Sequence, residues 1–303
     1  MRNSLIKRGT IQLLSLLLVS FGIAGYQIEP RHVPSESEFQ ANLIRDDLGR
    51  EVVLRRPVER AVSLAPSLTE AIFAVGAGDR LVGVTTYCNY PDAAKSIEKV
   101  GDTQTPNIER IVALKPDMVF VSTASQLEAF MQTLEKQHIS VFVVDAKGLD
   151  GIGRSLKTLG RLFGTESVAE TIAAELDRRT EAVAASVKDR PQTKVFVQIS
   201  KDPLFTIGKD SFLTEVVNRA GGVSATSEVA TAYPKLSKET ALALDPDVII
   251  LSDSEDNREP NAVFKNSKAV KNGRVYRINA DIISRPGPRL IDALEEIAKE
   301  LHQ

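Results

Sequence analysis

Two stretches of this chain repeat one pattern of apolar and polar positions. Residues 109–122 read ERIVALKPDMVFVS, residues 239–252 read ETALALDPDVIILS, and the two align without a gap. In each, a Glu opens an apolar run, a Pro-Asp pair follows, and four apolar residues precede a Ser. The pattern predicts a short helix over 110–114, which Pro116 ends, and a buried strand over 118–121. The second stretch predicts the same helix and strand pair.

Short apolar runs alternate with helical spacing around the first repeat. Residues 61–64 predict a strand, and Ser67 with Glu70 three positions later predicts a capping box for the helix that follows. Apolar positions recur at helical spacing between residues 127 and 134, and SVFVVDA at 140–146 is another apolar strand. Strands and helices in alternation, with short connections, predict a parallel sheet covered on both faces.

The middle of the chain is helical instead. Residues 149–163 and 166–188 predict two consecutive helices, the second capped by Thr165 and spanning about 34 Å. Strands return after Pro191 with KVFVQIS, DVIILS and RVYRINA, and the helix RLIDALEEIAKELH closes the chain. The expected fold class is α/β, with two Rossmann-like lobes of mostly parallel central sheets joined by one long α-helix.

The predicted organisation has five parts. In chain order they are an export signal or N-terminal anchor (1–25), a tether (26–43), an N-terminal α/β lobe (44–147), connecting helices (148–191) and a C-terminal α/β lobe (192–303). The two α/β lobes are called the first and the second lobe below.

The N-terminus has the character of a targeting segment. MRNSLIKRG carries three basic residues and no acidic one, and the apolar run TIQLLSLLLVSFGIAG follows. This order of charge, apolar run and small residues is typical of an export signal. It resembles a bacterial lipoprotein signal, except that Tyr26 stands where such a signal has Cys. Cleavage near Ala24 or Gly25 and retention as an uncleaved anchor both stay open.

Composition and charge exclude several classes of function. The 38 basic and 40 acidic side chains nearly balance, which does not favour a nucleic-acid binder. His32, His138 and His302 are scattered and Cys88 is the only cysteine, so a protein-built metal site is not expected. No base accompanies Cys88, and the chain has neither a GxxxxGK[ST] nor a GxGxxG loop. A hydrolase or oxidoreductase is therefore the weaker reading, and a structural or adhesion protein is a further alternative.

The repeated glutamates have two readings. Glu109 and Glu239 each come two residues after a capping type, Asn107 and Ser237. A carboxylate in a first helical turn complements the helix dipole, which stabilises a helix by about 0.3–1 kcal/mol. Alternatively, one exposed carboxylate on each lobe forms a matched pair that binds arginines of a symmetric partner.

Aromatic and acidic side chains follow several predicted strands. Tyr87 lies in the loop TTYCNYP, Phe205 lies in a loop that follows the strand KVFVQIS, and Tyr233 precedes the second repeat. Asp281 lies in the loop between the strand RVYRINA and the last helix. Ligands of open α/β sheets bind at the carboxyl ends of the strands, so these residues are candidates for a ligand site. Half-buried tyrosines that merely pack a loop are the alternative.

Several motifs in order resemble one family. RAVSLAPSLTEAIFAVGAGDRLVGVTTYCNYP, NIERIVALKPDMVFV, FTIGKDSFLTEVVNRAGG, YPKLSKE and SRPGPRLIDALEEIA, over about residues 44–302, look like the substrate-binding proteins of bacterial ABC importers for cobalamin and iron chelates. Within that family the chain is most similar to the cobalamin-binding proteins, chiefly through TTYCNYP and the second-lobe PLFTIGKDSF.

The resemblance implies roles for particular residues. It implies that Glu109 and Glu239 dock on arginines of the two permease subunits. One known cobalamin binder has Trp where this chain has Thr103 and Tyr233. The ligand-binding residues implied are Ser67 through its backbone, Tyr87, Thr103, Phe205, Tyr233 and Asp281.

The resemblance also implies a function. We expect an exported receptor, in the periplasm or on the outer face of the cytoplasmic membrane, that captures cobalamin between two lobes. It would deliver this ligand to an ABC permease dimer with its ATPase subunits, and it would touch the membrane through the permease and through the N-terminal segment if that is retained. Such a receptor is not an enzyme and has no cofactor of its own. A ferric siderophore or haem as ligand stays open.

Overall fold

Residues 42–123 and 128–303 are the part of the chain that the structure, a computed structural model, describes. These described residues form one compact unit. The predicted export signal and almost all of the tether lie outside the described residues. The first described element is a hairpin of two antiparallel strands, β1 (Asn42–Arg45) and β2 (Glu51–Leu54).

The first lobe is built on a four-stranded parallel sheet in the order β4-β3-β5-β6. Its strands are short and buried, which explains why they read as continuous apolar runs. Phe120 of β5 stacks on Phe163 with ring centroids 5.4 Å apart. The strand bounds are β3 (Ala61–Ser63), β4 (Leu81–Val84), β5 (Met118–Val121) and β6 (Ser140–Val143).

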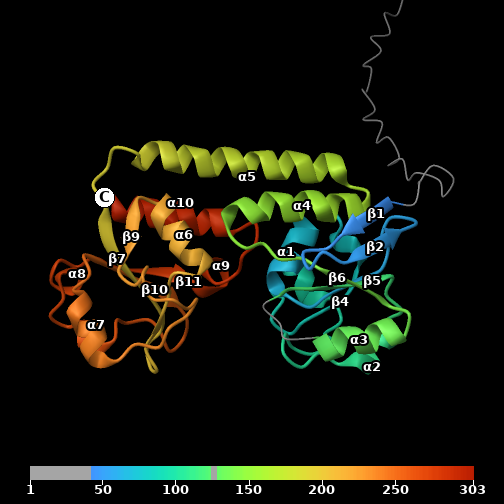
Figure 1. The fold of residues 1–303 in the computed structure, drawn as a ribbon, viewed down its shortest axis with the longest axis horizontal. Helices are drawn as coiled ribbons and strands as arrows, with labels where there is room; N and C mark the ends of the chain where they lie inside the picture. The colour runs from blue at the N-terminus through green and yellow to red at the C-terminus, as the bar shows by residue number, and fades with distance from the viewer. Residues whose placement is uncertain (1–41, 124–127) are drawn as a thin grey trace, which may run out of the picture. The chain divides into compact units, whose positions relative to one another are not determined.

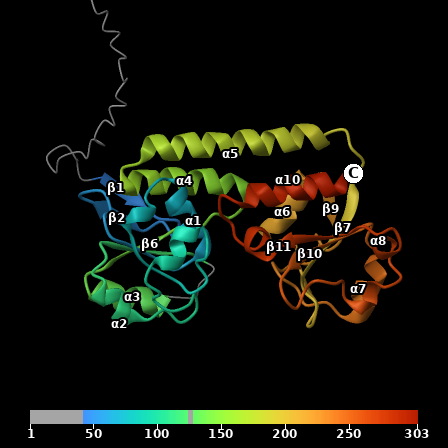
Figure 2. The same cartoon turned by 180° about the vertical axis from the view of Figure 1, so that it is seen from behind.

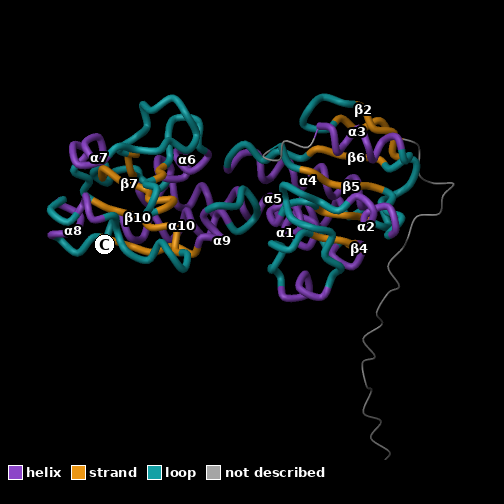
Figure 3. Tube along the Cα trace, turned by 90° about the horizontal axis from the view of Figure 1, so that it is seen from below, coloured by secondary structure: helices purple, strands orange, loops and turns teal. Residues whose placement is uncertain are grey.

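The second lobe has a five-stranded sheet of its own, and Figure 3 shows the strands of the two sheets as separate groups. Its order is β11-β10-β7-β8, and β9 also pairs with β7. All pairs are parallel except β7 with β8. The bounds are β7 (Thr193–Ser200), β8 (Phe205–Thr206), β9 (Gly222–Ser224), β10 (Val248–Asp253) and β11 (Val275–Asn279).

Helices cover both sheets, and one long helix follows the first lobe. This helix, α5 (Glu166–Val187), packs along α4 (Leu149–Phe163) and also along the last helix, α10 (Leu290–Leu301) (Figures 1 and 2). The other α-helices are α1 (Pro66–Ala74), α2 (Ile108–Ala113), α3 (Glu128–Lys136), α6 (Phe212–Arg219), α7 (Lys238–Leu244), α8 (Lys268–Lys271) and α9 (Ala280–Ile283). Short 3-10 helices lie at Gly78–Arg80, Asp92–Ser96 and Ala262–Phe264.

The predicted fold class is confirmed as mixed α/β with parallel sheets. The first helix of the middle region and the strand over 118–121 have the predicted bounds, and α5 ends one residue earlier than predicted. The two repeated stretches occupy equivalent places, because α2 leads into β5 and α7 leads into β10, each strand having a neighbour on both sides.

Two predicted helix caps are wrong. Ser67 lies inside α1, whose N-cap position is Ala65, and no side chain caps this helix. Pro66 is the reason, because its fixed φ suits the first helical turn and starts the helix two residues earlier than predicted. Thr165 does occupy the N-cap position of α5, but its side chain does not cap the helix, and its buried hydroxyl oxygen has no hydrogen-bond partner among the described residues.

Candidate functional site

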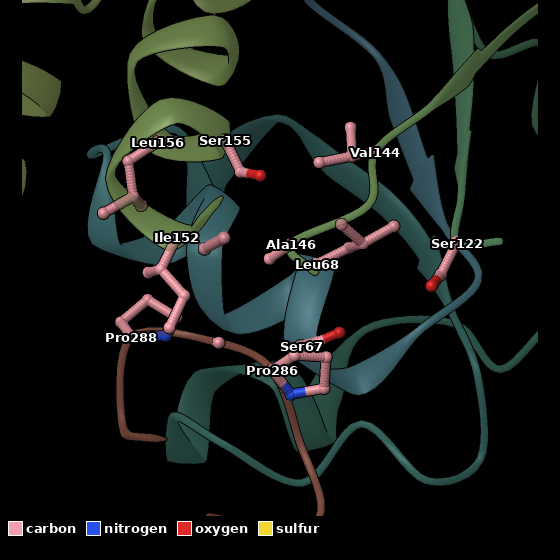
Figure 4. A pocket seen from close by; sticks show the side chains of 12 residues that line it. Ser67, Leu68, Ser122, Val144, Ala146, Ile152, Ser155, Leu156, Pro286 and Pro288 are labelled. Atoms are coloured by element: carbon pink, nitrogen blue, oxygen red, sulfur yellow. The ribbon is translucent and has the colours of Figure 1, made fainter. Parts of the chain in front are cut away.

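Ser67 lies where the two lobes touch. Figure 4 shows its side chain near the loop that carries Pro286 and Pro288, beside Ile152 and Leu156 of α4. A Cβ added to Gly287 would stand 3.4 Å from Ser67 atoms, so the two backbones are close. The cavity between them has a volume of only about 10 Å³, roughly the space of one water molecule. Ser67 therefore packs closely against the second lobe, and its place in ligand binding stays a prediction.

Tyr87 and Thr103 lie on adjacent loops of the first lobe. Tyr87 follows β4 and is 59% exposed. Its neighbour Thr86 donates a backbone hydrogen bond to Gly101, 2.9 Å from N to O, which holds the two loops together. Asp102 closes the turn around Thr103 by accepting from the Thr105 amide at 2.6 Å, and this bond lowers the pKa of Asp102. Two of the six predicted ligand residues therefore share one end of the first sheet.

Phe205 and Tyr233 lie together in the second lobe. The segments that carry them run antiparallel, with Thr206 donating to the carbonyl of Pro234 at 3.1 Å and Gly208 donating to that of Ala232 at 2.9 Å. Phe205 begins the short strand β8, whereas the sequence predicted a loop. Tyr233 is 44% exposed. Partial burial of its phenol raises its pKa, and a side-chain hydrogen bond with Ser211 offsets only part of this rise.

Asp281 connects the second lobe to the Tyr87 loop. It lies in the short helix α9 directly after β11, and not in a loop as predicted. One carboxylate oxygen accepts from Arg285 at 2.5 Å, and the other accepts from Asn89 Nδ2 at 2.7 Å. Arg285 also donates to the backbone carbonyl of Tyr87 at 3.3 Å. Asp281 and Tyr87, which are nearly 200 positions apart in the chain, thus meet through two side chains that the prediction left out.

Glu70 is the buried centre of the same network. Its side chain is only 3% exposed, and it accepts from Arg289 Nε at 2.8 Å and from Arg285 Nη1 at 2.9 Å. Arg289 in turn lies over the ring of Tyr90, with Cζ 3.9 Å from the ring centroid. Hydrogen bonding to Glu70 raises the pKa of Arg289. Sequence reasoning missed this role of Glu70, because its two partners lie 215 and 219 positions away and the segment that carries them, between α9 and α10, has no helical spacing.

Glu109 and Glu239 lie in the first turns of α2 and α7, and both are exposed. Both helices lie on the side of their sheets away from α5 (Figure 1). Within the described part of the chain, neither carboxylate has a cation within ion-pair distance. Glu239 accepts from its own backbone amide and from Ser237, and these bonds lower its pKa. The carboxylate of Glu239 thus stabilises its own helix end and is also exposed to a partner.

The structure therefore arranges the predicted ligand residues in groups. Tyr87 and Thr103 form one group, Phe205 and Tyr233 another, and Asp281 is tied to the first through Asn89 and Arg285. A larger cavity of about 360 Å³ includes none of the six in its lining, which α1, α5 and α10 share with the 90–91 and 288–289 segments.

Residues 42–123 and 128–303 contain no group of three His, Cys, Asp or Glu side chains placed to hold a metal ion. No helix in these two ranges has the length and apolar character that crossing a membrane requires.

Comparison with known proteins agrees with this architecture. A family model described as periplasmic binding protein matches residues 62–282. An uncharacterized ABC transporter substrate-binding lipoprotein of Bacillus subtilis, YvrC, is 32% identical over 269 residues, covering 86% of this chain and 85% of that protein. The crystal structure of the periplasmic vitamin B12 binding protein BtuF of Vibrio cholerae is 31% identical with a TM-score of 0.71, covering 81% of this chain and 97% of that one. A periplasmic heme binding protein of Pseudomonas aeruginosa is 27% identical with a TM-score of 0.71, covering 80% and 91%.

The class of protein follows from these matches and from the two-lobed fold. The chain belongs to the periplasmic binding protein family, whose members bind solutes and catalyse no reaction. The resemblance inferred from the motifs is confirmed, and so is the expectation that the chain is not an enzyme.

Proposed function

We propose that this protein is the extracytoplasmic receptor of an ABC importer and that its ligand is a corrinoid such as cobalamin. The receptor role follows from the family, since its members serve ABC transporters as substrate-binding proteins. The observation that carries the ligand proposal is the presence of aromatic side chains at one end of the sheet in each lobe, the exposed Tyr87 on one and the exposed Tyr233 with the half-buried Phe205 on the other.

The chemistry of a corrin suits these groups. A corrin ring is large, flat and amphipathic, so it needs apolar walls and a few polar contacts at its edge. Aromatic rings supply flat area at a small cost in conformational entropy, and each contributes about 0.5–1.5 kcal/mol beyond the area that it buries. Asp281 and Asn89 supply polar atoms beside Tyr87. The similarity to the vitamin B12 binding protein of Vibrio cholerae supports the same ligand class.

Haem or a ferric siderophore is the second candidate. The similarity to the heme binding protein of Pseudomonas aeruginosa favours it, and the phenols of Tyr87 and Tyr233 are groups that can ligate iron. The two ligand classes differ in what they ask of these tyrosines. A corrinoid stacks on the rings, whereas the ferric iron of a haem can take the deprotonated oxygen of one of them as an axial ligand.

Spectral titration separates the two candidates. The mature protein is titrated with hydroxocobalamin, haemin and a ferric hydroxamate in parallel, and calorimetry gives each affinity. Tyr87→Phe with Tyr233→Phe is the matched variant, because it keeps both rings and removes both oxygens. Tight hydroxocobalamin binding that survives this change supports the corrinoid. Tight haemin binding that is lost with it overturns the corrinoid in favour of haem.

The partner proposed is an ABC permease dimer with its ATPase subunits. Glu109 and Glu239, one exposed carboxylate on each lobe, have the chemistry to pair with one arginine on each permease subunit. Each helix end already satisfies its first-turn amide with Asn107 or Ser237, so neither carboxylate is required as an N-cap.

The location proposed is outside the cytoplasmic membrane. The basic and apolar start of the chain supports export, and the relatives are periplasmic proteins or lipoproteins. Because Tyr26 stands where a lipoprotein signal has Cys, we expect no lipid at this position. Mass spectrometry of the mature N-terminus tests this point, and a diacylglyceryl adduct near residue 26 contradicts it.

A further inference from the structure

A buried carboxylate of the first lobe is neutralised by the second. Glu70 lies in α1, and its partners Arg285 and Arg289 lie in the segment between α9 and α10. Arg289 holds the carboxylate with two donors, Nε at 2.8 Å and Nη2 at 2.6 Å. Burying a charged carboxylate this deeply is costly unless cations remain beside it. The two lobes therefore cannot separate at this point without leaving the Glu70 carboxylate unpaired.

Arg285 extends this contact to the candidate ligand residues. Besides Glu70, its guanidinium donates to Asn89 Oδ1 at 2.8 Å, to the carbonyl of Tyr87 and to Asp281. A planar fork of donors fixes the relative positions of all its acceptors, which a flexible ammonium group does not do. The Tyr87 loop and Asp281 are thus held at one separation by a side chain that Glu70 keeps in place.

The charges of this cluster balance. Two guanidinium groups face two carboxylates, Glu70 and Asp281, and the amide of Asn89 both donates and accepts within the cluster. Loss of Glu70 would leave Arg289 with no carboxylate and would leave Arg285 with only Asp281. Rearrangement of Arg285 then moves the groups that it contacts.

We infer that Glu70 is a positioning residue for ligand binding, which acts through Arg285 to set the separation of the Tyr87 loop from Asp281 across the two lobes. This inference rests on the proposed function for the identity of the ligand, but the lobe geometry that it describes does not depend on any ligand. Glu70 itself is the buried centre of the network, and both of its carboxylate oxygens accept from Arg285 or Arg289.

The test measures the distance between the lobes and the affinity together. Nitroxide labels are placed at the exposed positions Lys136→Cys and Lys265→Cys, one on each lobe. Double electron–electron resonance then measures the distance between the two labels in the absence of ligand. Calorimetry with hydroxocobalamin reads affinity. In Glu70→Gln we expect a broader or shifted distance distribution and an affinity lower by about tenfold, a coupling of ordinary size.

Asp46→Asn is the matched control. The Asp46 side chain is fully buried and pairs with Arg50 at 2.7 Å, but all of its partners belong to the first lobe. This variant should lose stability while keeping the lobe distance and the affinity of the parent. If Asp46→Asn changes both as Glu70→Gln does, general destabilisation explains the effect and the inference fails.

Arg285→Lys keeps the inference testable if the Glu70→Gln variant does not fold. This change keeps a positive charge beside Glu70 but removes the planar guanidinium donors. We therefore expect the same loss of ligand affinity and the same change in the distance between the lobes as in Glu70→Gln. Unchanged distances in every folded variant overturn the inference, whatever the protein binds. Altered distances in a protein that binds no corrinoid uphold the inference and overturn the proposed ligand.

Discussion

The pair α2–β5 and its counterpart α7–β10 have the same backbone conformation but different exposed side chains. Aligned residues Lys115 and Asp245 both adopt positive φ, 48° and 38°, directly before the two prolines. Proline disfavours the right-handed helical region for the residue that precedes it, so each helix must end there. The repeated pattern thus specifies where the helix stops.

The aspartates of the two Pro-Asp pairs also do the same work. Asp117 accepts from the amide of Arg60 at 2.9 Å, and Asp247 accepts from the amide of Lys194 at 3.3 Å. Each of these amides lies at the amino end of a neighbouring strand. Asp117 therefore fixes the start of β3 relative to β5, and Asp247 fixes the start of β7 relative to β10.

The exposed faces differ. Leu242 of α7 is 62% exposed one turn after Glu239, whereas the aligned Val112 of α2 packs against the first lobe's core. Arg110 of α2 donates to the carbonyl of Lys99, and the aligned residue of α7 is Thr240. The repeat therefore determines the backbone geometry, while the side chains around Glu109 and around Glu239 differ between the two lobes.

The largest effect is expected from the aligned core positions Phe120 and Ile250. Both are fully buried, but Phe120 also contacts the rings of Phe142 and Phe163. We expect Phe120→Ala to lower the free energy of unfolding by about 3–5 kcal/mol and Ile250→Ala by about 2–5 kcal/mol. Urea denaturation measures both. A smaller loss for Phe120→Ala than for Ile250→Ala would show that the aromatic cluster adds nothing.

The next effect concerns docking by Glu109 and Glu239. If both carboxylates bind permease arginines, Glu109→Arg with Glu239→Arg should lower uptake by a reconstituted transporter at least about tenfold, because like charges then meet across the interface. Ligand binding by the isolated receptor should not change. The Gln variants should show a smaller defect, and the double variant should be worse than either single one.

Full uptake by the double Arg variant would contradict the docking role. Glu109 and Glu239 would then only stabilise the first turns of their own helices. Glu175→Arg is the matched control, because it makes the same change of charge as each single variant but on α5, away from both acidic helices. It should leave uptake intact.

A moderate effect is expected from the two aspartates. Asp117 accepts from the amides of Glu59 and Arg60 and pairs with Arg56 at 2.9 Å, while Asp247 makes the longer bond to Lys194. Asp117→Ala should therefore cost about 1–3 kcal/mol of stability, more than Asp247→Ala. Paired thermal melts rank the two variants, and equal losses would contradict the comparison.

The smallest effect is a titration at Glu239. Hydrogen bonds from its own amide and from Ser237 hold its pKa below the ordinary value of 4.5. A depressed carboxylate pKa adds stability above the unfolded value, and that stability is lost as the pH falls through the folded value. Ser237→Ala should raise the pKa of Glu239 toward 4.5, as followed by NMR titration. No change would mean that the amide alone holds the carboxylate.

Periodicity was sufficient wherever burial is continuous along a segment. The bounds of α4 and β5 follow from apolar spacing, since each buries one unbroken face or run. It failed at Ser67, where local capping chemistry was outweighed by Pro66 one residue earlier. It also placed Phe205 and Asp281 in loops, because a two-residue strand and a four-residue helix are too short to leave a periodic signal.

The candidate ligand residues show the same division. Tyr87, Phe205 and Asp281 were recognisable as side chains that follow strands, since a parallel sheet presents its carboxyl ends at one edge. Their grouping was not recognisable. Asn89 lies 192 positions from Asp281, and nothing in the spacing of either segment names the other as its partner.

By itself the sequence determined the α/β class, the repeated helix–strand unit and the family, because these depend on local apolar spacing and on ordered motifs. The tertiary structure alone decided that Glu70 faces Arg285 and Arg289, 215 and 219 positions away, rather than capping its own helix. The physical reason is that a buried carboxylate must find cations, and which cations are near depends on how the two lobes meet.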